Sequence, residues 1–203
     1  MGDPERLGIL GGTFDPPHAG HLALARAARK AAALDRVLLV VAGDPWQKRG
    51  EVTAAAADRL AMTEALAAGE EGVEVSDVEV RRAGPSYTVD TLEALARPGR
   101  RLVLVLGDDV AARLSTWHRS ERVRELAELL VASRPGGDPA AASEVVDALR
   151  RDGWIVQAMA DRLVDASSTG IRARLATGDP VDGLVPDSVL RVIRDRGLYT
   201  PPQ

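Results

Sequence analysis

The sequence predicts an α/β protein with a parallel, doubly wound sheet and a short helical extension at the C-terminus. Short, unbroken runs rich in Val, Ile and Leu recur along the chain, and segments with helical periodicity lie between them. Unbroken apolar runs are typical of strands buried on both faces, and their alternation with helices is typical of βαβ units. After the last apolar run come two short helical patterns, which predict the extension.

Six segments are predicted as strands. Five of them are continuous apolar runs, as expected for strands covered by helices on both faces. The third segment, VEVSDVEV, alternates with a period of two, which predicts a half-exposed strand at an edge of the sheet. The six segments are residues 6–10, 36–42, 73–80, 101–107, 129–134 and 154–159.

Helical spacing of apolar residues predicts five helices between the strands and two after them. We expect one domain over residues 1–203, in which about 165–203 form the helical C-terminal part. The two final helices are predicted in SSTGIRARLATG and PDSVLRVIRDRG. The five earlier ones span 20–33, 54–68, 89–96, 120–128 and 139–151.

The composition excludes several classes of protein. The chain is 28% charged and 45% hydrophobic with a net charge of −4, so no basic surface indicates nucleic-acid binding. It has no cysteine, which excludes disulfides and thiolate catalysis and fits a reducing compartment. The N-terminal MGDPERLG has no apolar signal core, and no apolar run approaches 18 residues. We therefore expect a cytoplasmic protein without membrane or nucleic-acid partners; the oligomeric state, homo-oligomers included, is left open.

The segment after the first strand, Gly11 to His21, carries two of the three histidines of the chain. Adjacent glycines allow close backbone approach and leave N–H groups available to an anion. His18 and His21 stand where the first helix begins, and the helix dipole there favours negative charge. Two imidazoles at this place can donate hydrogen bonds to phosphate oxygens. The structural alternative is a helix cap at His18 and a surface residue at His21.

Three other groups of residues follow predicted strands or begin helices. Ser167, Ser168 and Thr169 crowd a helix start, with Arg172 one turn later, where N–H groups and hydroxyls can bind an anion. Asp108 and Asp109 directly follow a buried strand and either cap a helix or approach a metal ion. Trp117 can stack on an aromatic ring or fill a gap between helices.

GGTFDPPHAGHL, residues 11–22, resembles the signature of the H-x-G-H nucleotidyltransferases and, within them, of the bacterial nicotinate mononucleotide adenylyltransferases. GDPWQK, RAGPSYTVDTL, GDDVAARLSTWHR, VASRPG and SSTGIR also resemble segments of these enzymes, so the resemblance covers nearly the whole chain. Two departures stand out: the loop after the second strand is shorter than usual, and Asp165-Ala166 replaces a usual apolar residue. The resemblance implies a Rossmann-like fold and transfer of AMP from ATP to nicotinate mononucleotide.

Roles for individual residues follow from this resemblance. The catalytic set is His18, His21, Lys48 and Arg172. The ATP-binding set adds Gly11, Gly12, Thr13, Phe14, Gly107, Asp109, Arg134, Ser167, Ser168 and Thr169. The acceptor-binding set is Gly12, Thr13, Lys48, Tyr87, Thr88 and Trp117. Mg²⁺ is expected to arrive with ATP and no protein ligand is assigned to it, while Asp15 is expected to shape the turn before Pro16.

Other functions stay open from the sequence. A sister transferase would use nicotinamide mononucleotide or phosphopantetheine as the acceptor. A nucleotide-sensing relative would keep the fold without turnover, although it could then have lost His18, His21 and Arg172. A ligase-type adenylating enzyme needs a nucleophilic lysine in a K-x-D-G context, and neither Lys30 nor Lys48 has one.

Overall fold

The computed structural model describes residues 3–45, 50, 52–133, 137–159 and 166–200. Its strands form one six-stranded sheet in the order β3-β2-β1-β4-β5-β6. The pairings of β1 with β4, β4 with β5 and β5 with β6 are parallel. The predicted α/β class with a doubly wound parallel sheet is therefore confirmed, and the predicted edge position of the third strand is correct. The strands are β1 (Glu5–Gly12), β2 (Arg36–Val41), β3 (Val73–Ser76), β4 (Arg100–Gly107), β5 (Ala127–Ala132) and β6 (Val156–Met159).

The helices follow the predicted order. They are α1 (Ala19–Ala31), α2 (Ala56–Ala67), α3 (Thr88–Leu95), α4 (Asp108–Ala111), α5 (Ser120–Leu126), α6 (Pro139–Arg151), α7 (Ser168–Thr177) and α8 (Asp187–Asp195), with a 3₁₀ turn η2 (Leu114–Thr116). Among the described residues, no helix is long and apolar enough to cross a membrane.

Three differences from the prediction stand out. The strand expected over 73–80 ends at Ser76, and residues 78–80 form a turn. The helix expected over 120–128 ends at Leu126, because Ala127 has an extended backbone and begins β5. The short α4 and η2 lie between β4 and α5, where no element was predicted.

The chain clusters into two compact units. Unit 1 comprises residues 1–10, 24–38 and 87–163; unit 2 comprises 11–23, 39–86 and 164–203. The division passes through β1, α1 and β2. The single domain predicted from the sequence stays a prediction.

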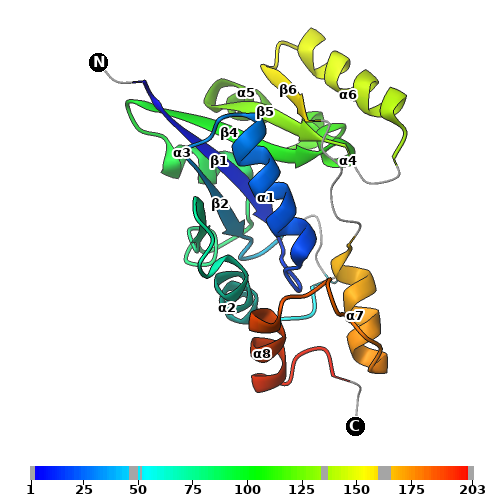
Figure 1. Cartoon of the computed structure of the whole chain (residues 1–203). Helices are drawn as coiled ribbons and strands as arrows, with labels where there is room; N and C mark the ends of the chain where they lie inside the picture. Colours follow the sequence, from blue (N-terminus) through cyan, green and yellow to red (C-terminus); the bar gives the residue numbers. More distant parts are fainter. Residues whose placement is uncertain (1–2, 46–49, 51, 134–136, 160–165, 201–203) are drawn as a thin grey trace. The chain divides into compact units, whose positions relative to one another are not determined.

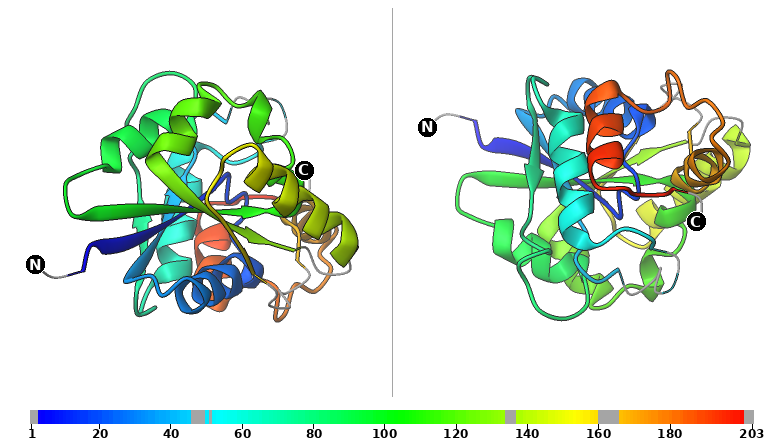
Figure 2. Two further views of the ribbon diagram at one scale, coloured as in Figure 1. Left: turned by 90° about the horizontal axis from the view of Figure 1, so that it is seen from above. Right: turned by 90° about the horizontal axis from the view of Figure 1, so that it is seen from below.

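Unit 1 contains the central strands and helices on both faces of them. Figure 2 shows α1 and α6 on one face and α3 and α5 on the other. Within β4, residues 102–105 are almost completely buried, as are 129–131 in β5. This explains why both strands read as continuous apolar runs.

Unit 2 contains the loop after β1 and the three helices α2, α7 and α8. Helices α2 and α8 lie side by side (Figure 1). Met62 and Leu66 of α2 and Val189 and Ile193 of α8 are buried. Helix α7 begins with a capping bond from the Gly170 N–H to Ser167 Oγ at 3.1 Å and ends at Gly178 in a left-handed conformation.

Candidate functional site

The loop after β1, in unit 2, places both histidines of the H-x-G-H segment together. The rings of His18 and His21 stack with their centroids 3.8 Å apart. The backbone N–H of His18 donates to His21 Nδ1 at 3.2 Å. Nδ1 of a neutral His21 is therefore the acceptor and its Nε2 carries the proton, which leaves Nε2–H as the donor of that ring.

His18 is more buried than the sequence indicated, with only 6% of its surface exposed. Burial lowers the pKa of His18 to about 4, so the ring is neutral at pH 7. Among the described residues, its buried Nδ1 has no hydrogen-bond partner. The buried ring of His18 can therefore take part in hydrogen bonding but carries no full positive charge at pH 7.

Phe14 shapes the backbone between the glycines and the histidines. Its ring is buried, packs edge-on against His21 with centroids 4.8 Å apart, and its backbone is left-handed with φ of 51°. A Cβ at Gly12 would lie 3.0 Å from the Phe14 ring, so glycine is needed for this close packing. Phe14 thus acts on the conformation of the loop through its packing, a role that the sequence did not indicate.

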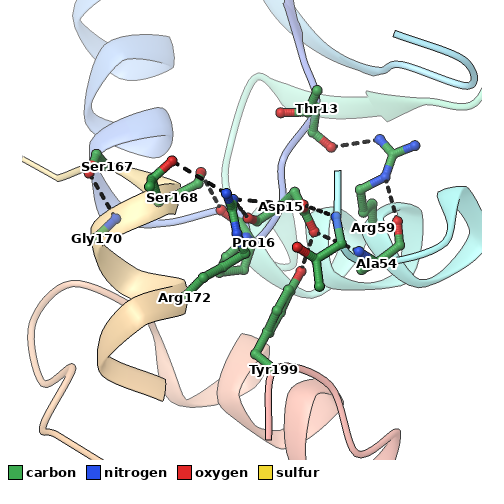
Figure 3. Close-up of polar contacts among 12 residues, drawn as sticks. Thr13, Asp15, Pro16, Ala54, Arg59, Ser167, Ser168, Gly170, Arg172 and Tyr199 are labelled. Carbon is green, nitrogen blue, oxygen red and sulfur yellow. Dashed lines mark hydrogen bonds and ion pairs between the residues drawn. The ribbon is translucent and has the colours of Figure 1, made fainter. Parts of the chain in front are cut away.

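The structure brings the S-S-T-x-I-R motif against this same loop (Figure 3). Ser168 Oγ donates to the Pro16 carbonyl at 2.9 Å, and Arg172 Nη1 donates to the Asp15 carbonyl at 2.7 Å. Ser167 is the N-cap of α7, where its side chain accepts from the Gly170 N–H. The N-terminus of α7 and the guanidinium of Arg172 are therefore fixed beside the loop that precedes the histidines.

Two charged residues, Asp15 and Arg59, are each only 1% exposed. Sequence reasoning missed Arg59 and expected Asp15 only to shape the turn before Pro16. Arg59, from α2, donates to the carbonyls of Thr13 at 2.7 Å, Ala54 at 3.1 Å and Gly43 at 3.3 Å. Burial lowers the pKa of the Arg59 guanidinium, and the Asp15 carboxylate opposes this shift. The signal available in the sequence was weak, because an arginine in an amphipathic helix is usually solvated.

The loop after β2 is attached to the segment that precedes α3. Ser86 Oγ accepts from the N–H groups of Gly43 at 3.0 Å and Asp44 at 3.2 Å, and the Ser86 N–H donates to the Asp44 carbonyl at 2.8 Å. A Cβ at Gly43 would lie 2.3 Å from the Glu79 carbonyl oxygen, which explains the glycine. Lys48, predicted further along this loop, lies outside the described residues, as does Arg134.

The remaining predicted site residues belong to unit 1. Gly107 precedes α4, and a Cβ there would lie 2.8 Å from Asp109 Oδ1. The Asp109 N–H donates to Asp108 Oδ1 at 2.8 Å, so the capping alternative fits Asp108. Within the described ranges, no three His, Asp or Glu residues are grouped as ligands for a metal ion.

Tyr87 and Thr88 stand at the start of α3. Tyr87 is the N-cap residue and makes no side-chain capping bond. The N–H groups of a first helical turn have no acceptor within the helix, so they are suited to a carboxylate. The Tyr87 ring packs on His118 with centroids 4.4 Å apart, a partner that the sequence did not indicate.

Trp117 follows η2 and is half-buried. Its Nε1 is buried and has no hydrogen-bond partner in the part of the chain that the structure describes. The ring is thus neither fully exposed nor fully enclosed, and its stacking role stays a prediction.

Comparison with known proteins identifies the family of the chain. The cytidylyltransferase-like family model matches residues 9–174. A Bordetella avium protein named "Probable nicotinate-nucleotide adenylyltransferase" is 41% identical over 97% of this chain and 99% of its own length. One of the same name from Roseiflexus is 43% identical over 95% and 97%.

A solved structure shares the fold. The Plasmodium falciparum nicotinic acid mononucleotide adenylyltransferase, complexed with NaAD, has a TM-score of 0.76 at 14% identity and covers 96% of this chain and 97% of its own. At this identity the likeness shows the fold alone, while the full-length sequence matches above show the family. The chain therefore belongs to the cytidylyltransferase-like family and, within it, to the nicotinate-nucleotide adenylyltransferases.

Proposed function

We propose that the protein transfers AMP from ATP to nicotinate mononucleotide, giving nicotinate adenine dinucleotide and pyrophosphate. An oxygen of the acceptor phosphate attacks the α-phosphorus of ATP, and the bond from the α-phosphorus to the bridging oxygen breaks as pyrophosphate leaves. A phosphate monoester has its second pKa near 6, so at pH 7 it is mostly a dianion and needs no general base. The protein has to align the reactants and stabilise charge on the phosphates.

The observation that carries this proposal is the hydrogen bonding of α7 to the loop after β1. Two motifs far apart in the sequence are held together by the Ser168 and Arg172 bonds to Pro16 and Asp15. These bonds hold hydroxyls, a helix N-terminus and a guanidinium beside the loop that precedes the histidines. Such an assembly suits a polyphosphate, because each part offers donors or positive potential.

Individual roles in unit 2 are part of the proposal. His18 and His21 donate to oxygens around the α- and β-phosphates, and the backbone from Gly11 to Phe14 holds the acceptor phosphate and ATP. Ser167, Ser168, Thr169 and Arg172 hold the β- and γ-phosphates. Because His18 is neutral at pH 7, the positive charge in this set comes mainly from Arg172.

In unit 1, Gly107 and Asp109 are proposed to contact the adenosine, with Asp109 accepting from ribose hydroxyls. The first turn of α3, at Tyr87 and Thr88, would receive the nicotinate carboxylate, and Trp117 would stack on the pyridine ring. The resemblance to the family also supports roles for Lys48 at the acceptor phosphate and for Arg134 near ATP.

We propose that magnesium enters as the MgATP complex. The absence of a grouped ligand set among the described residues gives no support to a resident protein-bound ion. We further propose a cytoplasmic location, because the reaction consumes ATP.

A panel of acceptors tests the proposed function. The purified protein is incubated with MgATP and, separately, with nicotinate mononucleotide, nicotinamide mononucleotide and phosphopantetheine, and pyrophosphate and dinucleotide are measured. We expect both products with the nicotinate compound at the highest kcat/KM. Faster turnover of another acceptor would indicate the sister transferase, and ATP binding without pyrophosphate release would indicate the sensor.

A further inference from the structure

The Asp15 carboxylate joins four segments of unit 2. It accepts from the N–H of Thr53 at 2.7 Å, the N–H of Ala54 at 3.0 Å and the hydroxyl of Tyr199 at 2.6 Å. Arg172 Nη1 lies 3.7 Å from its second oxygen, Oδ2. A carboxylate only accepts hydrogen bonds, so the three donors and the neighbouring guanidinium complement it.

Tyr199 reaches this carboxylate from the turn that follows α8. Its backbone is left-handed, with φ of 57°, which is unfavourable for a bulky residue and persists only where surrounding contacts enforce it. Burial and the Asp15 carboxylate raise the pKa of the Tyr199 hydroxyl, so Tyr199 is a fixed donor and Asp15 the acceptor. The hydroxyl of Tyr199, as distinct from its ring, makes the hydrogen bond to Asp15 (Figure 3).

Arg172 is oriented by the same residue in a different way. Its Nη1 donates to the Asp15 backbone carbonyl at 2.7 Å, while its Nη2 lies 3.4 Å from Thr169 Oγ1. The distance of 3.7 Å to Asp15 Oδ2 is too long for a hydrogen bond. The guanidinium is thus hydrogen-bonded to the backbone carbonyl of Asp15, whereas with the carboxylate it makes only a longer ion pair.

The donors on Asp15 account for this separation. Three hydrogen bonds already satisfy the carboxylate, so it attracts the guanidinium less strongly than a bare carboxylate would. Removal of the Tyr199 donor would leave Asp15 Oδ1 with one bond and increase its pull on Arg172. The planar fork of Arg172 would then turn toward Asp15, with fewer N–H groups directed at a phosphate.

We propose that Tyr199 is a positioning residue that acts through Asp15 to keep Arg172 directed at the phosphates of ATP. This inference rests on the proposed function, because that function assigns Arg172 to ATP. It also gives the turn after α8 a role in ATP affinity, although Tyr199 itself need not touch the nucleotide.

The first test is a pair of variants. Tyr199→Phe removes one hydroxyl, and Thr200→Ala is the matched control, because among the described residues the Thr200 hydroxyl donates only to the Gly197 carbonyl, at 3.4 Å. Loss of one hydrogen bond in a charged network should raise the KM for ATP about three- to tenfold. In Tyr199→Phe, the KM for nicotinate mononucleotide should stay within about twofold of the wild type. In Thr200→Ala, both KM values should stay within about twofold of the wild type. Equal increases of both KM values, or no increase, would overturn the proposal.

A double-mutant cycle tests whether the effect passes through Arg172. ATP dissociation constants are measured without acceptor for the wild type, Tyr199→Phe, Arg172→Ala and the double variant. If Tyr199 acts through Arg172, the hydroxyl deletion should have no effect on ATP affinity in the Arg172→Ala background. An equal effect in both backgrounds would show that Tyr199 acts in another way.

A measurement on the wild type does not depend on the folding of any variant. By reciprocity, ATP should slow amide hydrogen exchange at Tyr199 and Thr200, whereas AMP, which lacks the β- and γ-phosphates, should not. Unchanged exchange with ATP, or equal protection by AMP, would contradict the inference. If the wild type binds ATP and shows this protection but forms no dinucleotide, the proposed function fails while the inference about Arg172 stands.

Discussion

Arg59 offers a sharp test of how the loop after β1 is supported. Replacement by Met retains most of the buried apolar volume but removes the donors to the carbonyls of Thr13, Ala54 and Gly43. Each buried carbonyl left without a donor costs about 1–3 kcal/mol, and the Asp15 carboxylate also loses a nearby positive charge. Because three carbonyls lose their donor, we expect Arg59→Met to lower the free energy of unfolding by at least about 3 kcal/mol.

Urea unfolding followed by circular dichroism measures this loss. The matched control is Arg196→Met, which breaks a partly exposed ion pair between Arg196, directly after α8, and Asp58 of α2 with an N–O distance of 2.6 Å. Exposed pairs contribute about 0–1 kcal/mol, so the control should unfold close to the wild type. The reasoning would be refuted if Arg59→Met lost less than about 1 kcal/mol or no more than the control.

Three further predictions concern other residues. Arginines 100, 97 and 36 lower the pKa of Glu5 to about 2, so its stabilisation is present above pH 4.5 and lost as the pH falls toward 2. Glu5→Gln should therefore lose at most about 1 kcal/mol at pH 7, and the difference in Tm from wild type should shrink by pH 3. His18→Ala and His21→Ala should each lower kcat about 10²- to 10³-fold, measured by pyrophosphate release; near-normal kcat would exclude a phosphate-binding role. Trp117→Ala should weaken nicotinate and nicotinamide mononucleotide to a similar degree in kcat/KM, and a collapse of their ratio would contradict the stacking role.

Most of the fold could be predicted because strands buried on both faces have an unmistakable composition. After their initial arginine, the runs RLVLVLG and RVLLVVA contain no polar side chain. They form β4 and β2, which both lie in the interior of the sheet. Helix α4, of four residues, and η2, of three, were missed because neither is long enough to show a helical period. The alternation in residues 73–80 extended past the true end of β3 because periodicity does not report where strand pairing stops.

The candidate site was predictable where function depends on local residue patterns. The two histidines and the Ser167–Arg172 segment each stand at the start of a helix, and this position can be recognised without tertiary structure. Asp15, by contrast, acquires its role from partners 38, 39 and 184 residues away. Such contacts leave no periodic signal, so their importance became visible only in the folded chain.

Isotope transfer tests the central claim most directly. The protein is incubated with nicotinate mononucleotide and ATP labelled with ³²P at either the α- or the γ-position, and the products are separated. Adenylyl transfer predicts that α-label enters the dinucleotide, that γ-label appears only in pyrophosphate, and that the two products form in equal amounts. Transfer of γ-label to the acceptor, or release of pyrophosphate without an acceptor, would contradict the account.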